Sequence, residues 1–471
     1  MERLKLVFPK LFRLPRARQV VVAFLLSICI NANFVVSASN YAHVERLSSE
    51  ARLSASDEEF LEDLSRRAFR YFLEQSDPHT GLVLDRAHTD GSVHDENHRH
   101  TASIAATGFG LTALCIAAER NWISRDEARG RVLTTLLFFA EKVPHVHGWF
   151  YHWMDWRNGE RRWQSEVSSI DTALLLAGIL TARGYFRNDR EINRLATLIY
   201  NRVDFRWMLA GHSSILSHGW KPEIGFLKPR WDNYSEHNTL YLLAIGSPTH
   251  PITARSWLAW SRQRITYAGY TYITGGPLFI HQYAHAWVDF RNQRETWYPF
   301  TDYFANSIAA TRAHKAFCLT LAQEFPGYSE NVWGVTASDS PQGYVAWGGP
   351  PRDPAIDGTV VPAAAGGSLM FTSDITLPAL RTMRDKYGER IYNRYGFVDA
   401  FNPTTDWTGP DVIGISVGIT LLSAENLRTG NVWRWFMRNR EIERAMHSVG
   451  LRRTNARKRF NSLQRSRRSK G

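Results

Sequence analysis

The chain has 471 residues, of which 44% are hydrophobic and 13% aromatic, which is the composition of a globular protein with a large core. Its formal net charge is +12, but the excess positive charge is concentrated at the two ends of the chain. The nearly neutral body lacks the basic footprint of a nucleic-acid-binding protein, so we expect no nucleic-acid partner.

A secretory signal is predicted at the N-terminus. Six basic residues precede the apolar run Val20–Val36, and the small residues at 36–38 suit cleavage after Ala38. We assign residues 1–38 to a signal peptide and 39–55 to a linker, with an uncleaved membrane anchor as the alternative, and expect an exported, periplasmic or secreted protein. Cys115 and Cys318 lie in apolar helical patterns, which predicts two buried free thiols.

The body is predicted to be mostly helical. Ser56 begins a capping box with Glu59, and Ser124 begins a second one with Glu127. A helical run of apolar residues follows each capping box. Further helices are predicted at Ala102–Glu119, Ser169–Ala182, Arg190–Val203, Ser235–Ile245, Ile252–Gln263, Ile280–Arg291, Asp302–Glu324, Ile375–Tyr387, Gly414–Leu427 and Asn431–Ser448.

Long segments rich in Gly, Pro and Trp separate these helices, and loops of such length are usually functional. About a dozen helices with aromatic loops between them indicate an all-α fold, an (α/α)6 barrel whose loops form a cleft at one end. A stacked-helix solenoid is the alternative, but the chain shows no repeat of fixed period. The segments are Asp77–Thr101, Pro144–Glu166, Leu209–Asn233, Ala268–Pro277 and Val332–Gly367.

Two carboxylates stand near the start of strongly apolar helices, each close to Trp and Tyr. Asp171 lies in the stretch Gly148–Ala182, and Glu236 lies in Lys228–Gly246. Paired carboxylates cleave glycosidic bonds, and aromatic faces bind sugar rings. The helix dipole favours an ionised Asp171, whereas aromatic packing would raise the pKa of Glu236. We predict that Glu236 is a general acid and that Asp171 is a base or a sugar-binding group; each could instead be an ordinary acid at a helix start.

Asp406 and Asp411, which flank Trp407, are the other candidates for the catalytic base. The candidates for substrate binding share a place in the aromatic loops or at the start of a helix. They are Trp149, Trp153, Trp163, Glu166, Trp231, Tyr234, His281, His285 and Asp302.

Three histidines gather in the segment HDENHRH, where His94, His98 and His100 accompany Asp95 and Glu96. Their spacing does not match the familiar helical zinc pair. We interpret the segment as a solvated polar loop, with a metal cluster as the alternative, and we predict neither a metal nor an organic cofactor. The chain contains no glycine-rich phosphate loop and no Gly-x-Ser-x-Gly motif.

Five longer motifs carry a family resemblance. They are SPTHPI (Ser247–Ile252), GGPLFIHQYAHAWVDFR (Gly275–Arg291), WGVTASDSPQGY (Trp333–Tyr344), YGFVDAFN (Tyr395–Asn402) and IGISVGITLLSAENLRTGNVW (Ile413–Trp433). Together they resemble the glucoamylase-like family that includes bacterial β-1,2-glucanases (glycoside hydrolase family 144-like) and the hydrolase-like region of cyclic β-1,2-glucan synthases. The resemblance spans about residues 56–450, which we assign to one catalytic domain.

The resemblance implies an (α/α)6 barrel, hydrolysis with inversion and no cofactor. It also implies functional roles for Asp171, which opens the matching helix, and for Glu236, which precedes the SPTHP-type element. This chain departs from the family at Ser168 and Ser416, where relatives often carry acids. We expect an exported glycoside hydrolase that cleaves a β-glucan, β-1,2-linked by the resemblance. A catalytically impaired glycan-binding or polysaccharide-assembly protein is the alternative.

The C-terminal segment 451–471 carries nine basic residues and no acid, which predicts a disordered tail. Such a tail could touch an anionic membrane or polymer. Apart from an oligo- or polysaccharide substrate, we expect no further partner and a monomeric protein.

Overall fold

The computed structural model describes residues 53–273 and 275–454. The predicted signal peptide, most of the linker and most of the basic tail lie outside the described residues. The described residues form one compact unit with thirteen α-helices. The helices are α3 (Ala55–Glu74), α4 (Ile104–Glu119), α5 (Arg125–Glu141), α6 (Ser169–Tyr185), α7 (Arg190–Arg202), α8 (Asn238–Gly246), α9 (Tyr283–Trp287), α10 (Tyr303–Thr320), α11 (Pro362–Gly366), α12 (Leu369–Tyr387), α13 (Gly414–Arg428), α14 (Asn431–Phe436) and α15 (Arg440–Ser448).

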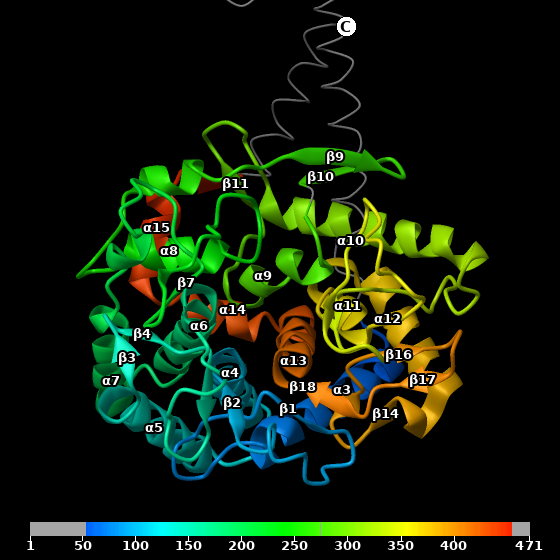
Figure 1. Ribbon diagram of the computed structural model, residues 1–471, viewed down its shortest axis with the longest axis horizontal. Coiled ribbons are helices and arrows are strands. Elements are labelled where there is room, and N and C mark those ends of the chain that lie inside the picture. Colours follow the sequence, from blue (N-terminus) through cyan, green and yellow to red (C-terminus); the bar gives the residue numbers. More distant parts are fainter. Residues whose placement is uncertain (1–52, 274, 455–471) are drawn as a thin grey trace, which may run out of the picture. The chain divides into compact units, whose positions relative to one another are not determined.

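The helices form two concentric layers, which confirms the predicted (α/α)6 barrel. Helices α4, α6, α8 and α13 are buried along most of their length, as their apolar sequences require. Helices α3, α7 and α15 are amphipathic and bury one face each, and α5 also buries one face, although its sequence pattern is not amphipathic. Figure 1 shows α4, α6, α9 and α13 in the middle, with α5, α7, α15, α10, α12 and α3 around them.

Glycine allows the two central helices α4 and α6 to approach each other closely. A Cβ at Gly178 would lie 2.0 Å from the carbonyl oxygen of Gly108, and a Cβ at Gly108 would lie 2.3 Å from that of Leu174. No side chain fits at such distances, so the contact is made by backbone against backbone. It holds the N-terminus of α6 in a fixed place beside α4.

The segments that the sequence predicts as long loops contain short strands. They form eight antiparallel pairs and one three-stranded sheet among the described residues. The pairs are β1 (Arg86–His88) with β18 (Asp411–Ile413), β2 (Thr101–Ser103) with β5 (Trp153–Asp155), β3 (His145–Val146) with β4 (Trp149–Phe150), β9 (Arg264–Tyr267) with β10 (Tyr270–Ile273), β11 (Gln293–Glu295) with β19 (Leu451–Arg453), β12 (Ala337–Ser338) with β13 (Val345–Ala346), β14 (Tyr392–Asn393) with β15 (Gly396–Phe397) and β16 (Phe401–Asn402) with β17 (Trp407–Thr408). The three-stranded sheet contains β6 (Val167–Ser168), β7 (Gly219–Lys221) and β8 (Gly225–Phe226).

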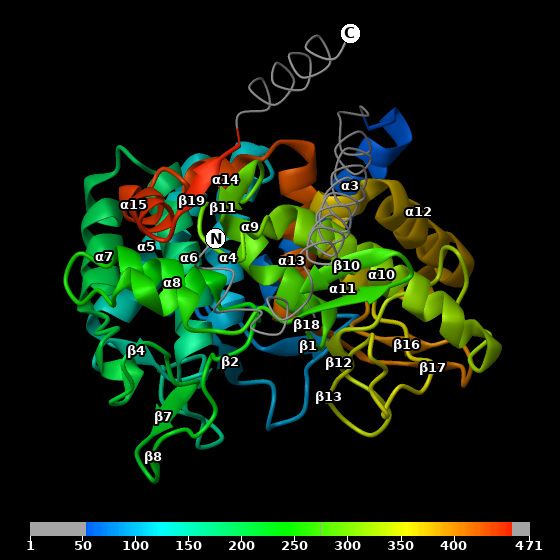
Figure 2. The ribbon, with the colours of Figure 1, turned by 90° about the horizontal axis from the view of Figure 1, so that it is seen from above.

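Most of these strands gather at one end of the barrel, which we call the mouth. Figure 2 shows β1, β2, β7, β8, β12, β13 and β18 at this end, and β11 and β19 on the opposite side. Three inner helices start directly after a mouth strand: α4 after β2, α6 after β6 and α13 after β18. Their N-termini therefore face the mouth, where helix dipoles favour negative charge.

Some predicted helices begin or end elsewhere. Helix α3 is capped by Ser54, whose side chain accepts the N–H of Asp57, and not by Ser56. Helix α5 is capped by Ser124 as predicted. Helix α8 begins at Asn238, so Glu236 lies in the turn before it.

Three predicted helices are shorter or divided. The segment 252–263 forms only a 3₁₀ turn at Ala254–Leu258, because the chain there bends to bury Trp257 and Trp260. The segment 280–291 contains the 3₁₀ turn Leu278–His281 and the short α9. The segment 431–448 is divided at Asn439, whose side-chain amide donates to the carbonyls of Leu180 and Phe436.

The start of the predicted tail is ordered. Leu451–Arg453 form β19 and pair with β11, because the apolar Leu451 is buried opposite Glu295. Cys115 and Cys318 are buried free thiols, as predicted. Among the described residues, no helix combines the length and the apolar character that a membrane span needs.

Candidate active site

Asp171 lies at the mouth, in the first turn of α6. The backbone N–H of Asp171 donates to the hydroxyl of Ser168, which is the N-cap of the helix, and that hydroxyl donates back to the Asp171 carboxylate. Asp171 is only 8% exposed, and burial raises the pKa of its carboxyl. Ser168, the first departure from the family pattern, therefore supports Asp171 directly.

A histidine joins Asp171 to a second acid. His152 places Nε2 at 3.5 Å from Oδ1 of Asp171, and its Nδ1 is 3.0 Å from Oε1 of Glu166. Burial lowers the pKa of His152, but the charge of Asp171 and the hydrogen bond to Glu166 outweigh burial, so the pKa is raised. Its ring stacks on Trp153 at 3.6 Å between centroids. His152 thus lies between two carboxylates, and in its protonated form it can pair with both of them.

Glu236 has a different environment. It is 8% exposed, and burial raises its pKa, with the charge of Asp171 acting in the same direction. The hydroxyl of Ser235 donates to Oε2 of Glu236, and among the described residues Glu236 forms no ion pair. A buried carboxyl without a cation is the easier of the two acids to protonate. Glu236 thus suits a proton donor, and Asp171, beside His152, suits an ionised group.

Buried aromatic and imidazole groups form the floor below Glu236. Tyr234 is 5% exposed, and its ring lies 5.3 Å from that of His281. Burial lowers the pKa of His281 to about 3, so its imidazole is neutral, and its Nδ1 lies 3.4 Å from the amide nitrogen of Asn306. This floor excludes water and holds the turn that carries Glu236.

A second charged group lies along the mouth around Arg86. This guanidinium is 2.9 Å from Asp339 and 3.4 Å from each of Asp85 and Asp411. Asp85 also accepts the indole N–H of Trp153 at 3.4 Å, which joins this group to the one around Asp171. One arginine thus faces three carboxylates, and the mouth is lined by acids on both sides.

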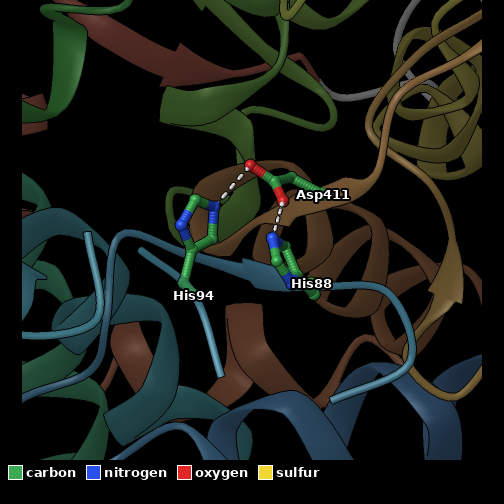
Figure 3. A group of neighbouring side chains, drawn as sticks. All are labelled: His88, His94 and Asp411. Carbon is green, nitrogen blue, oxygen red and sulfur yellow. Dashed lines mark hydrogen bonds and ion pairs between the residues drawn. The ribbon is translucent and has the colours of Figure 1, made fainter. Parts of the chain in front are cut away.

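Asp411 also contacts two histidines. Figure 3 shows His94 and His88 pointing at the two oxygens of its carboxylate, with Nε2 atoms at 3.0 and 3.7 Å. The three donor atoms are close enough together to hold a divalent cation. In the structure, however, Nδ1 of His94 accepts the N–H of Asp95, which leaves its Nε2 protonated and donating to Asp411. In this arrangement Asp411 is a hydrogen-bond partner of His94, and the interpretation of the HDENHRH segment as a polar loop stays a prediction.

The mouth contains one more buried acid, Asp399. Its carboxylate accepts the N–H of Asp339 at 2.8 Å, and the hydroxyl of Ser416 also donates to it. Burial, together with the charge of Asp339, raises the pKa of Asp399 to about 7. Ser416, the second departure from the family pattern, is therefore a hydrogen-bond partner of a neighbouring acid.

The structure brings some of the predicted aromatic residues to the mouth. Trp163 is 39% exposed, lies edge-on to Trp153 and donates its indole N–H to Asn97. Trp231 is nearly buried; it stacks on His218 and donates to Ser169 at the start of α6. Trp153 and Trp163 can contact a sugar ring, whereas Trp231 supports the helix that carries Asp171.

Four predicted site residues lie elsewhere. Trp149 is fully buried and donates to the carbonyl of Asp204, so it belongs to the core. His285 is 1% exposed and packs among the rings of Phe290, Phe304 and Phe371. Asp302 caps α10 by accepting the N–H of Ala305. The side chain of Asp406 is 86% exposed on the turn between β16 and β17, where it pairs with Arg390. The placements of Trp149, His285 and Asp302 do not fit sugar binding. The placement of Asp406 does not fit general-base catalysis.

Several residues at the mouth were not predicted from the sequence. His152 stands between Tyr151 and Trp153 in an aromatic loop, and Asp339 and Asp399 stand inside two of the family motifs. The position of both acids inside these motifs is the sequence signal that indicates them. Arg86, in β1, and Asp85, directly before it, lie outside these motifs and carry no such signal.

The (α/α)6 barrel with buried carboxyls at its mouth is similar to the fold of glucoamylase-like proteins. Comparison with known proteins agrees: the Glycoamylase family model matches residues 228–440. The resemblance expected from the sequence motifs is thereby confirmed.

Three similar proteins are named as enzymes that act on β-1,2-linked glucans or their oligosaccharides. An exo β-1,2-glucooligosaccharide sophorohydrolase (non-reducing end) of Parabacteroides distasonis is 27% identical over 469 aligned residues, which cover 90% of this chain and 63% of that protein. The chain thus spans less than two thirds of that relative. The endo-β-1,2-glucanase of Chitinophaga pinensis, solved with sophorotriose and glucose, superposes with a TM-score of 0.77 at 26% identity, over 85% of this chain and 99% of that one. A β-1,2-glucanase structure from P. distasonis gives a TM-score of 0.75 at 25% identity, over 85% and 60%.

Proposed function

We propose that this protein is a glycoside hydrolase that cleaves β-1,2-linked glucan. The observation that carries the proposal is the contrast between Glu236 and Asp171. Both carboxyls are buried at the mouth within electrostatic reach of each other, but only Asp171 lies beside a histidine that stabilises its charge. A glycosidase needs one protonated and one ionised carboxyl group. The relatives that act on β-1,2-glucans support the choice of linkage.

In this proposal, Glu236 protonates the leaving oxygen, directly or through a substrate hydroxyl. Asp171 stays ionised because His152 is protonated, and it binds the sugar at the cleavage point or orients the attacking water. Asp411 remains a second candidate for the base, since its carboxylate is buried at the mouth, where it pairs with Arg86. Attack by water on the face opposite the leaving group would invert the anomeric centre.

The test is a panel of glucans with β-1,2, β-1,3, β-1,4 and β-1,6 linkages, with products separated by chromatography and their first-formed anomer followed by NMR. We expect short oligosaccharides from the β-1,2-glucan alone, released first as the α-anomer. Glu236→Gln should abolish product release, and the exposed Glu443→Gln on α15 is the matched control. An unchanged rate for Glu236→Gln would overturn the assignment.

A second candidate function is glycan binding without cleavage. It is favoured by Ser168 and Ser416, which stand where an enzyme of this class could carry further acids. Tight binding of β-1,2-glucan in calorimetry, with no product after long incubation, would select it over hydrolysis.

We also propose that the protein is exported, with cleavage after Ala38. Fractionation of cells that express the full chain, followed by N-terminal sequencing, tests this. We expect a mature chain that begins at Ser39 outside the cytoplasm; an intact N-terminus in the membrane fraction would indicate an anchor instead.

A further inference from the structure

Three large aromatic side chains are exposed on one short turn. Trp297, Tyr298 and Phe300, between β11 and α10, are 42%, 81% and 48% exposed. Single exposed apolar side chains are normal on proteins, but a group of them marks an interaction surface. In the described part of the chain, no other stretch of four residues exposes more than one large hydrophobic side chain.

The turn is rigidly held from below. Thr296 donates its N–H to the carbonyl of Gly450, and Arg294 donates to the carbonyl of Phe300 at 2.9 Å. Glu295, in the strand beneath, is buried and accepts from Arg262 and from the indole of Trp257. Hydrogen bonds therefore hold the backbone of the turn that exposes the three aromatic rings.

Three arginines without a carboxylate partner among the described residues lie on the strands that carry the turn and pair beside it. Arg294 on β11 lies directly opposite Arg452 on β19, and Arg453 lies opposite Gln293. None of the three arginines forms an ion pair with a carboxylate of residues 53–273 or 275–454. Like charges directly opposite each other destabilise a pair of strands. The arrangement is understandable if an external anion compensates the charge.

The chain continues from this place with more positive charge. Residues 455–471, which follow β19, contain seven basic residues and no acid. Strands β11 and β19 lie on the side of the barrel opposite the mouth, as Figure 2 shows. The exposed aromatics and the three arginines thus lie at the end remote from the candidate active site, as does Thr454, which directly precedes the basic segment in the sequence.

We propose that this surface, composed of Arg294, Trp297, Tyr298, Phe300, Arg452 and Arg453, docks on an anionic phospholipid bilayer. Trp and Tyr favour the interface between headgroups and acyl chains. Arginines near an anionic bilayer are attracted to its surface charge, and stable anchoring needs both an apolar and a basic contribution. Docking in this way turns the mouth away from the bilayer, toward a soluble polymer. The inference is independent of the proposed catalytic activity.

The test is co-sedimentation of the full chain with vesicles of phosphatidylcholine alone or with about 30 mol% phosphatidylglycerol, an anionic surface of the kind that attracts basic segments. We expect binding to the anionic vesicles that falls as salt rises. Arg294→Gln combined with Arg452→Gln and Arg453→Gln, and separately Trp297→Ser combined with Tyr298→Ser and Phe300→Ser, should each weaken binding at least tenfold. Ile224→Ser, which changes an exposed apolar residue at the mouth, is the control and should bind as the wild type does.

Three outcomes would overturn the proposal. Equal binding to neutral and anionic vesicles would assign the attraction to the apolar N-terminal segment. Full binding by both triple variants would remove this surface from the interaction. Binding to nucleic acid or an anionic polysaccharide without binding to vesicles would identify a polyanion as the partner. Tyr298→Ser alone changes the most exposed of the three aromatic residues and should weaken vesicle binding by a smaller factor. This single variant tests the surface even if the triple variants misfold.

Discussion

The hydroxyl of Ser168 and the carboxylate of Asp171 form a reciprocal pair at the start of α6. Ser168 accepts the backbone N–H of Asp171 and donates its own proton to the carboxylate. One side chain thus caps a helix of the inner ring and orients the acid that this helix presents to the mouth. What looks in the sequence like the loss of an acid is, in the structure, a support for the acid that remains.

Ser168→Ala should therefore have two separable effects. Loss of the cap should lower the free energy of unfolding by about 1 kcal/mol. Loss of the hydrogen bond to the carboxylate should raise the pKa of Asp171, because that bond favours the ionised form. Urea unfolding measures the first effect, and the acid limb of the pH–rate profile for β-1,2-glucan measures the second. Ser168→Thr keeps the hydroxyl and should show neither; a variant Ser168→Ala that is as stable as the wild type would contradict the capping role.

His152→Gln tests whether the charge of His152 keeps Asp171 ionised. The positive charge of His152 lowers the pKa of Asp171, so removing it should raise that pKa and move the acid limb of activity to higher pH. The alkaline limb, if set by Glu236, should stay in place. His212→Gln, on an exposed turn, is the control. If the pH–rate profile keeps its shape and only the rate falls, His152 acts by packing against Trp153 alone.

Two tryptophans predicted to bind substrate should now behave differently. Trp149→Ala removes a fully buried indole and should lower the free energy of unfolding by about 3–5 kcal/mol. Trp163→Ala changes a residue exposed at the mouth and should leave stability within about 0.5 kcal/mol while weakening the binding of β-1,2-glucan oligosaccharides. Urea unfolding and calorimetric titration distinguish the two. Unchanged oligosaccharide affinity in the Trp163 variant would exclude it from the sugar-binding surface.

Asp399 predicts a dependence of stability on pH. Its pKa is raised to about 7 in the folded protein, against about 4 in an unfolded chain. Between these values the folded state holds a proton that the unfolded state has lost, so the contribution of Asp399 to stability decreases as the pH rises from about 4 to about 7. The decrease is at most about 4 kcal/mol.

Asp399→Asn should remove this decrease. The measurement is the difference in unfolding free energy between wild type and variant at several pH values, since the other carboxyls then cancel. Asp385→Asn, measured in the same way, is the control for removing the charge of an exposed carboxylate. A difference for Asp399→Asn that does not change with pH would show that its pKa is not raised.

Local patterns in the sequence indicated much of the barrel. Apolar runs without a polar face predicted α4, α6 and α13, since a helix that is buried all round has no need of one. The prediction was wrong at 252–263 and at Asn439, where tertiary contacts of Trp257, Trp260 and the Asn439 amide outweigh helical periodicity. Short strands at the mouth were also missed, because pairs of two or three residues leave no alternating pattern to read.

The sequence by itself determined the fold class, the resemblance to glucoamylase-like proteins and the prominence of Asp171 and Glu236, because these depend on periodicity, motifs and residue type. Only the tertiary structure decided which of the remaining candidates share the mouth. It joined His152 to Asp171 and Arg86 to Asp411, and it placed Trp149 in the core and Asp406 on an exposed turn. The physical reason is that burial and partners set the charge and the access of a side chain, and both come from segments that lie far apart in the chain.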